Sequence, residues 1–133
     1  MLTPKLHLTY ILILCEDIDR MKNFYRDLFG SYEVDSESET GLALRAGNVL
    51  LALRKRTRGY DGSGVRADLP GVQIAFLVAA DEVALCYQYL VEKGVQILEP
   101  PTDQPRGHRT VYFADPEGNQ LEIYAEIEPF PAA

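Results

Sequence analysis

A carboxylate within a strand-like segment is the first residue of the sequence that could carry chemistry. Glu122 lies inside the stretch 120–126, in which β-forming residues dominate. Because successive side chains of a strand point to opposite faces, Gln120, Glu122 and Tyr124 are expected on one face. A carboxylate in such a place can act as a general base, accept hydrogen bonds or bind a divalent metal. Glu122 is therefore the first candidate for a catalytic or ligand-binding residue.

Two further polar side chains stand in strand-like segments nearer the N-terminus. The same alternation groups Tyr10 with Leu12 and Leu14, and it groups Gln73 with its second neighbour Ala75. A few polar groups converging on an apolar surface are typical of a small-molecule site. We therefore expect Tyr10 and Gln73 to contact a ligand together with Glu122 and Tyr124, although these polar groups could also satisfy one another.

His108 precedes the strand predicted at 109–114. Two interpretations stay open for it. It is either an exposed loop histidine or a pocket residue that binds a ligand or transfers a proton, since its ordinary pKa lies near physiological pH.

Composition narrows the class of protein. The 133 residues are 47% hydrophobic and 25% charged, which suits one globular domain, and the formal net charge of −7 argues against binding a nucleic-acid backbone. No run of about 20 apolar residues could cross a bilayer, and the first residues do not resemble a signal peptide. Cys15 and Cys86 both lie in apolar stretches and are expected to be buried thiols. A cytoplasmic protein without nucleic-acid or membrane partners is predicted.

An internal repeat organises the elements that must position these residues. Asp17 to Gly30 and Asp81 to Gly94 are helix-like intervals of equal length, and each follows a strand-like run. Three strand candidates follow each helix, which predicts two βαβββ modules of one α+β fold. The predicted strands are 8–14, 32–36, 41–46 and 49–54 in the first module and 72–78, 96–98, 109–114 and 120–126 in the second.

A segment rich in glycine and basic residues separates the two modules. We predict a single domain over 1–133, with module one at about 6–54, a linker at 55–71 and module two at about 72–127. A solvated linker is the ordinary interpretation of 55–71. A lid or dimer-contact loop that presents positive charge to an anionic ligand is the alternative.

The motifs of the chain resemble the glyoxalase, bleomycin-resistance and extradiol-dioxygenase superfamily, also called the vicinal-oxygen-chelate superfamily. The resemblance is carried by segments that follow one another in the family's order across the duplicated unit. They are Asp17-Ile18-Asp19-Arg20, the helix Phe24 to Gly30, the strand Gln73 to Val78 and the run Tyr112 to Ile123 with its Asp115-Pro116-Glu117-Gly118-Asn119 turn. The resemblance implies that the two modules form a curled mixed sheet around a cleft, with the helices outside.

The resemblance also implies a metal site, which the residues of this chain only partly supply. Where members often carry histidine, this chain has Tyr10 and Gln73, and the position at the end of the first module falls near Leu51. Glu122 is the one standard ligand left, with Gln73 as a second donor if any metal binds. A catalytic divalent site needs about three imidazole, carboxylate or thiolate ligands. We therefore expect no cofactor, and a divalent metal stays an alternative.

Two function classes follow from this site. The favoured one is a metal-free small-molecule-binding protein similar to the bleomycin-resistance proteins, for which the acidic balance suggests a cationic guest. The alternative is a lyase, isomerase or dioxygenase of the same superfamily that uses Glu122 as a base or as a residual metal ligand. The resemblance implies a homodimer, the commonest symmetric assembly.

Overall fold

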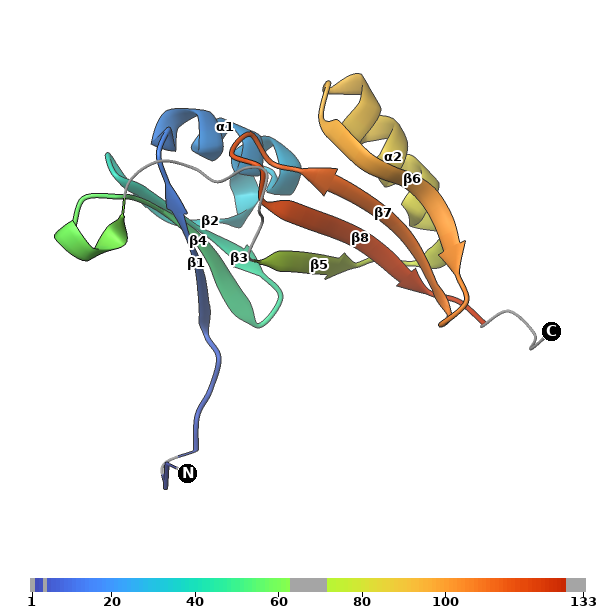
Figure 1. Cartoon of the computed structure of the whole chain (residues 1–133), viewed down its shortest axis with the longest axis horizontal. Coiled ribbons are helices and arrows are strands. Elements are labelled where there is room, and N and C mark those ends of the chain that lie inside the picture. The colour runs from blue at the N-terminus through green and yellow to red at the C-terminus, as the bar shows by residue number, and fades with distance from the viewer. Residues whose placement is uncertain (1, 4, 63–71, 129–133) are drawn as a thin grey trace. The chain divides into compact units, whose positions relative to one another are not determined.

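The computed structural model describes residues 2, 3, 5–62 and 72–128 (Figure 1). It divides into two units, 1–65 and 66–133, and each is described by itself. Each unit holds a four-stranded mixed sheet and one α-helix among its described residues. The predicted α+β class and the order βαβββ of each module are confirmed. The curling of the two sheets around a shared cleft stays a prediction, as does the single-domain organisation.

The first unit contains β1 (Tyr10–Cys15), α1 (Ile18–Phe29), β2 (Val34–Ser38), β3 (Gly41–Ala46) and β4 (Val49–Lys55), with 3-10 turns at Ser31–Glu33 and Gly59–Asp61. The strand order is β1-β4-β3-β2, with β1 parallel to β4 and the other pairs antiparallel. The helix α1 contacts β3 and β4, and apolar side chains fill the space between them. The buried set is Ile13, Ile18, Met21, Tyr25, Leu42, Leu44, Leu51 and Leu53.

Local signals set both ends of α1. The Asp17 carboxylate accepts a hydrogen bond from the backbone N–H of Arg20, which caps the first turn. Gly30 ends the helix with φ at +89°, a conformation that side chains with a Cβ rarely adopt. The predicted interval from Asp17 to Gly30 is therefore confirmed at both ends.

The second unit contains β5 (Gln73–Leu77), α2 (Val83–Glu92), β6 (Gln96–Gln104), β7 (His108–Ala114) and β8 (Gln120–Glu126), with a 3-10 turn at Ala80–Glu82 before α2. The strand order β5-β8-β7-β6 repeats the order of the first sheet, with β5 parallel to β8. Val83 and Leu90 of α2 are buried, as are side chains on one face of β7 and β8. That buried set is Val111, Phe113, Leu121, Ile123 and Ala125.

Three predicted strands were wrong by more than one residue in their bounds. The strand expected at 8–14 begins only at Tyr10 and ends at Cys15. The strand expected at 32–36 begins only at Val34, because residues 31–33 form a 3-10 turn. The strand expected at 96–98 continues to Gln104, through Pro100 and Pro101. β6 lies at the end of the sheet, where a proline has no ladder hydrogen bond to lose on its open side.

The basic segment after β4 is partly ordered by ion pairs. Lys55 still belongs to β4, and Arg54 and Arg56 both donate hydrogen bonds to Asp61 in the following turn. This part of the predicted linker is therefore held against β4. Residues 63–71 of that linker lie outside the described residues. Among the helices that the structure describes, none has the length and apolar character needed to cross a membrane.

Candidate functional site

The polar residues predicted for the second module lie on the face of its sheet opposite the buried set that includes Val111 and Phe113. The register pairs Ala75 with Glu122 and Tyr112 with Glu122, and paired residues of neighbouring strands share a face. Glu122 is only 5% exposed, although its neighbour Gln73 is exposed. The sheet thus surrounds the carboxylate of Glu122 with neighbouring side chains while leaving the end of β5 open.

A chain of hydrogen bonds joins Glu122 to two glutamines. Nε2 of Gln73 donates to Oε1 of Glu122 at 2.9 Å, and Nε2 of Gln120 donates to Oε1 of Gln73 at 2.6 Å. Both polar ends of the Gln73 amide are therefore engaged. Gln73 thus presents its amide N–H group to the carboxylate.

His108 and Tyr124 form a second pair on the same face. His108 is the first residue of β7, and its ring centroid lies 4.8 Å from that of Tyr124. Both side chains are half-buried. The interpretation of His108 as an exposed loop residue is therefore wrong, whereas its role in binding or proton transfer stays a prediction. The pair occupies a different row of the face from Glu122, because Tyr124 is in register with Leu77 and Thr110.

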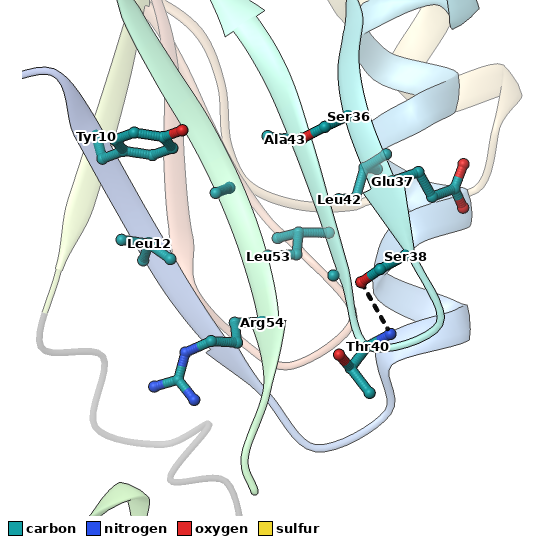
Figure 2. A pocket seen from close by; sticks show the side chains of 12 residues that line it. Tyr10, Leu12, Ser36, Glu37, Ser38, Thr40, Leu42, Ala43, Leu53 and Arg54 are labelled. Carbon is teal, nitrogen blue, oxygen red and sulfur yellow. Dashed lines mark hydrogen bonds between the residues drawn. The ribbon is translucent and has the colours of Figure 1, made fainter. Parts of the chain in front are cut away.

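Tyr10 lies in the first unit, on β1, and is 49% exposed. It lines a cavity of about 330 Å³ in that unit together with side chains from β1 to β4 (Figure 2). Its position with respect to Gln73 and Glu122 stays a prediction. The structure therefore brings Gln73, Glu122 and their neighbours together in the second unit, and within the first unit it places Tyr10 beside the cavity.

The family resemblance implies a third lost ligand position near Leu51, and the register shows which residue there faces the same way as Tyr10. Leu51 pairs with Ile11 and Leu44, is 1% exposed and belongs to the buried layer against α1. The residue that shares the face of Tyr10 is Ala52, which pairs with Leu12. Neither residue can bind a metal, so the conclusion about ligand chemistry is unchanged.

Several polar residues near Glu122 in the second unit were not predicted from the sequence. Tyr112 is in register with Glu122, and its hydroxyl accepts a hydrogen bond from Nη2 of Arg106 at 3.0 Å. Glu99 is in register with Tyr112 and accepts from Gln104 at 3.0 Å. Alternation along 108–114 could have identified Tyr112. The side chain of Arg106 reaches back from a turn, and no local pattern signals this.

A divalent metal requires several strong donors that lie close together. No group of three or more histidine, cysteine, aspartate or glutamate side chains lies together among the residues that the structure describes. Of the positions named by the sequence, only Glu122 offers a strong donor, and it is paired with the Gln73 amide. A catalytic site normally has three such protein ligands. The residues present do not match this donor set.

Comparisons with known proteins agree with the duplicated fold. The model of the Glyoxalase/Bleomycin resistance protein/Dioxygenase superfamily matches residues 7–123. The Metallothiol transferase FosB of Staphylococcus haemolyticus is 30% identical over 118 residues, which are 89% of this chain and 80% of that protein. The Glyoxalase domain-containing protein RDO1 of Mycosarcoma maydis is 25% identical over 119 residues, 87% of this chain and 66% of that protein. A glyoxalase/bleomycin resistance protein/dioxygenase structure from Nocardioides has a TM-score of 0.79 at 22% identity, covering 99% of this chain and 91% of that one.

Proposed function

Because the chain belongs to the Glyoxalase/Bleomycin resistance protein/Dioxygenase superfamily, we propose that it is a small-molecule-binding protein without a complete metal site. The hydrogen bond from Gln73 to Glu122 carries this proposal. It places a neutral amide against Glu122, the one standard ligand among the positions that the family resemblance names, and Gln120 fixes the orientation of that amide. A cavity of about 330 Å³ in the first unit supports the binding half of the proposal, since small-molecule sites start near this volume.

In this proposal Gln73, Glu122, His108 and Tyr124 are the ligand-binding residues of the second unit, and Tyr10 is the ligand-binding residue of the first. Glu122 accepts hydrogen bonds from a ligand donor that competes with the Gln73 amide. The His108–Tyr124 pair offers ring surface for apolar or aromatic parts of a ligand. These roles are consistent with the usual mixture of apolar surface and few polar groups in ligand sites.

Metal content tests the proposal most directly. Protein purified without chelators is analysed for metals, and thermal melts are then recorded with nickel, zinc, manganese, iron and cobalt. We expect no stoichiometric metal and no rise in melting temperature, because ligand binding to the folded state alone would raise it. One ion that binds at one per chain and raises the melting temperature would contradict the proposal.

A second candidate function is an enzyme of the same superfamily, and one specific observation favours it. The relative at 30% identity is named a metallothiol transferase, a name that joins metal to group transfer. In that case Glu122 would serve as a base or as a residual metal ligand, in a lyase, isomerase, dioxygenase or transferase. Replacing Glu122 with Gln separates the candidates. An enzyme would lose turnover of its substrate, whereas a binding protein would show no turnover before or after the change and would only bind its ligand more weakly.

We also propose a homodimer in the cytoplasm. Leu6 and Leu8 alternate along the N-terminal extended segment that leads into β1, and they are 72% and 71% exposed. Within the first unit β1 has a strand neighbour on one side only, so a second copy is the simplest cover for this apolar edge. Cys15 is a buried thiol and Cys86 a partly buried one, as is usual for proteins of a reducing compartment.

Light scattering at micromolar concentration tests the assembly. We expect twice the chain mass of 14.9 kDa for the wild type and a monomer for the variant with Leu6→Glu and Leu8→Glu. A monomeric wild type would contradict the proposed dimer. The small-molecule-binding function would not be affected by that result, because ligand binding tests it separately.

A further inference from the structure

The cavity of the first unit lies on the face of the sheet opposite α1 and has a floor of small side chains. Ala43 and Ala52 are in register on β3 and β4, and they are 6% and 5% exposed. Tyr10 and Leu12 of β1 flank this floor and stay about half exposed, and Figure 2 shows the Tyr10 ring directed across the neighbouring strand. Because the side chains of Ala43 and Ala52 are small, they leave an open space that the larger side chains of Tyr10 and Leu12 border.

Hydroxyl groups border the cavity on the side of β2. Ser36 and Ser38 are in register with Ala43 and Gly41, so they share the face of the cavity floor. The Ser38 hydroxyl accepts a hydrogen bond from the backbone N–H of Thr40 at 3.3 Å and keeps its own hydrogen to donate. The wall is polar but uncharged.

The cationic side chain of Arg54 lines the cavity, and the buried carboxylate of Asp61 compensates its charge. Nη1 and Nη2 of Arg54 donate to the two carboxylate oxygens of Asp61 at 2.9 Å each. The backbone N–H groups of Thr57 and Arg58 donate to the same carboxylate at 3.0 and 2.9 Å. The Arg54 guanidinium, aided by these N–H groups, holds the pKa of Asp61 far below its ordinary value, so the pair is fully ionised at neutral pH.

The one acidic residue of the lining is compensated as well. The side chain of Glu37 points toward α1, where its carboxylate accepts hydrogen bonds from Lys22 at 3.2 Å and from Arg26 at 2.6 Å. These hydrogen bonds lower the pKa of Glu37 and keep it ionised. Each charged residue of the lining is thus matched by an opposite charge within its own unit.

We propose that this cavity binds a neutral molecule with an apolar body and a hydroxyl, carbonyl or amide group, and that Asp61 sets this preference by neutralising Arg54. The inference rests on the proposed small-molecule function and names its ligand class. In this cavity an ionic guest would lose hydration without finding a free counter-charge among the lining residues, whereas the hydroxyls of Ser36 and Ser38 can satisfy a neutral polar group. The local charges therefore outweigh the net charge of −7, which had suggested a cationic guest.

Three probes with the same ring and different head groups test the preference in the full-length protein. Benzamide, benzoate and benzylamine are titrated while the backbone amides of the 15N-labelled protein are followed by NMR. We expect benzamide to shift the amides of Gly41, Ala43 and Ala52, with a dissociation constant at least about tenfold below those of both charged probes. Benzoate or benzylamine binding there as tightly as benzamide would overturn the proposal.

The Asp61→Asn variant tests the role of the ion pair. It leaves the charge of Arg54 uncompensated beside the cavity, so we expect benzoate to bind about tenfold more tightly while benzamide changes less than twofold. Asp103→Asn is the matched control, because it breaks the similar bidentate pair of Arg109 and Asp103 in the second unit. An unchanged ratio of benzoate to benzamide in Asp61→Asn, or an equal change in the control, would refute the role of Asp61.

The wild-type ratio decides the preference even if Asp61→Asn does not fold. Probes that shift only amides of β5 and β8 would remove the cavity as the site and leave the binding function standing. If none of the three probes shifts any amide at millimolar concentration, both this inference and the binding function lose their support.

Discussion

Removing the Gln73 amide should destabilise the chain by about 1.5 kcal/mol, and this cost is set by the carboxylate that the amide contacts. The hydrogen bond to Glu122 is 2.9 Å long, and Glu122 is 5% exposed. Hydrogen bonds to charged groups contribute about 1.5–3 kcal/mol, and the exposure of Gln73 favours the lower end of that range. The variant Gln73→Leu keeps a similar side-chain length and deletes the donor. The Glu122 carboxylate would then lie in a buried place with one hydrogen-bond donor fewer.

The measurement is urea unfolding at pH 7, with free energies extrapolated linearly to water. Gln120→Leu is the matched control, because it removes a donor to Gln73 and does not touch the carboxylate. We expect the control to lose only about 0.5 kcal/mol, as is usual for a bond between neutral and partly exposed groups. The double variant Gln73→Leu with Glu122→Leu should recover part of the loss, since no charge is left without its donor.

Two results would refute this reasoning. A loss below about 0.3 kcal/mol for Gln73→Leu would mean that water replaces the amide without cost, which the burial of Glu122 argues against. Equal losses for Gln73→Leu and Gln120→Leu would mean that packing rather than the charged hydrogen bond sets the effect. In either case the Gln73–Glu122 contact would no longer support the metal-free proposal.

Three further predictions concern the scaffold. The pKa of Asp61 is lowered in the folded chain, so its contribution to stability is complete above its unfolded pKa near 4 and is lost as pH falls below that value. The stability of Asp61→Asn should therefore depend less on pH between 4 and 2 than that of the wild type. Acid unfolding followed by circular dichroism measures this difference. Gly30→Ala should cost about 1–3 kcal/mol because φ is +89° there, whereas Gly59→Ala, which has neither a positive φ nor a close neighbour, should cost little; equal urea midpoints would contradict this. Phe113→Ala should cost about 3–5 kcal/mol because the ring is fully buried, and a loss below 1 kcal/mol would show that the core of the second unit is not formed as described.

The duplicated order of elements could be predicted from the sequence because its signals are local. The Asp17 side chain caps the helix that follows it, and Gly30 ends that helix with a positive φ. Neither signal depends on residues distant in the chain. The strand at 96–104 was predicted too short because Pro100 and Pro101 oppose a strand locally, and only the pairing with β7 carries it on.

The face of a residue was harder to predict than its element. Leu51 and Ala52 are neighbours, and a difference of one residue moves a side chain from the open face to the layer against α1. The pattern Val49 to Leu53 is apolar throughout, so alternation gives no indication of which residue points where. Pairing with β1 and β3 decides it.

By itself, the sequence determined the α+β class, the βαβββ order of each module and the loss of standard metal-ligand types at Tyr10 and Gln73, because these depend on residue identity and local pattern. Only the tertiary structure decided what the remaining polar groups contact. In the structure Gln73 donates a hydrogen bond to Glu122, 49 residues further along the chain, and Arg54 donates to Asp61. The charge of Arg54 is therefore not free to meet an anion. Such pairings follow from strand register and chain reversal, which bring together residues whose spacing in the sequence carries no signal.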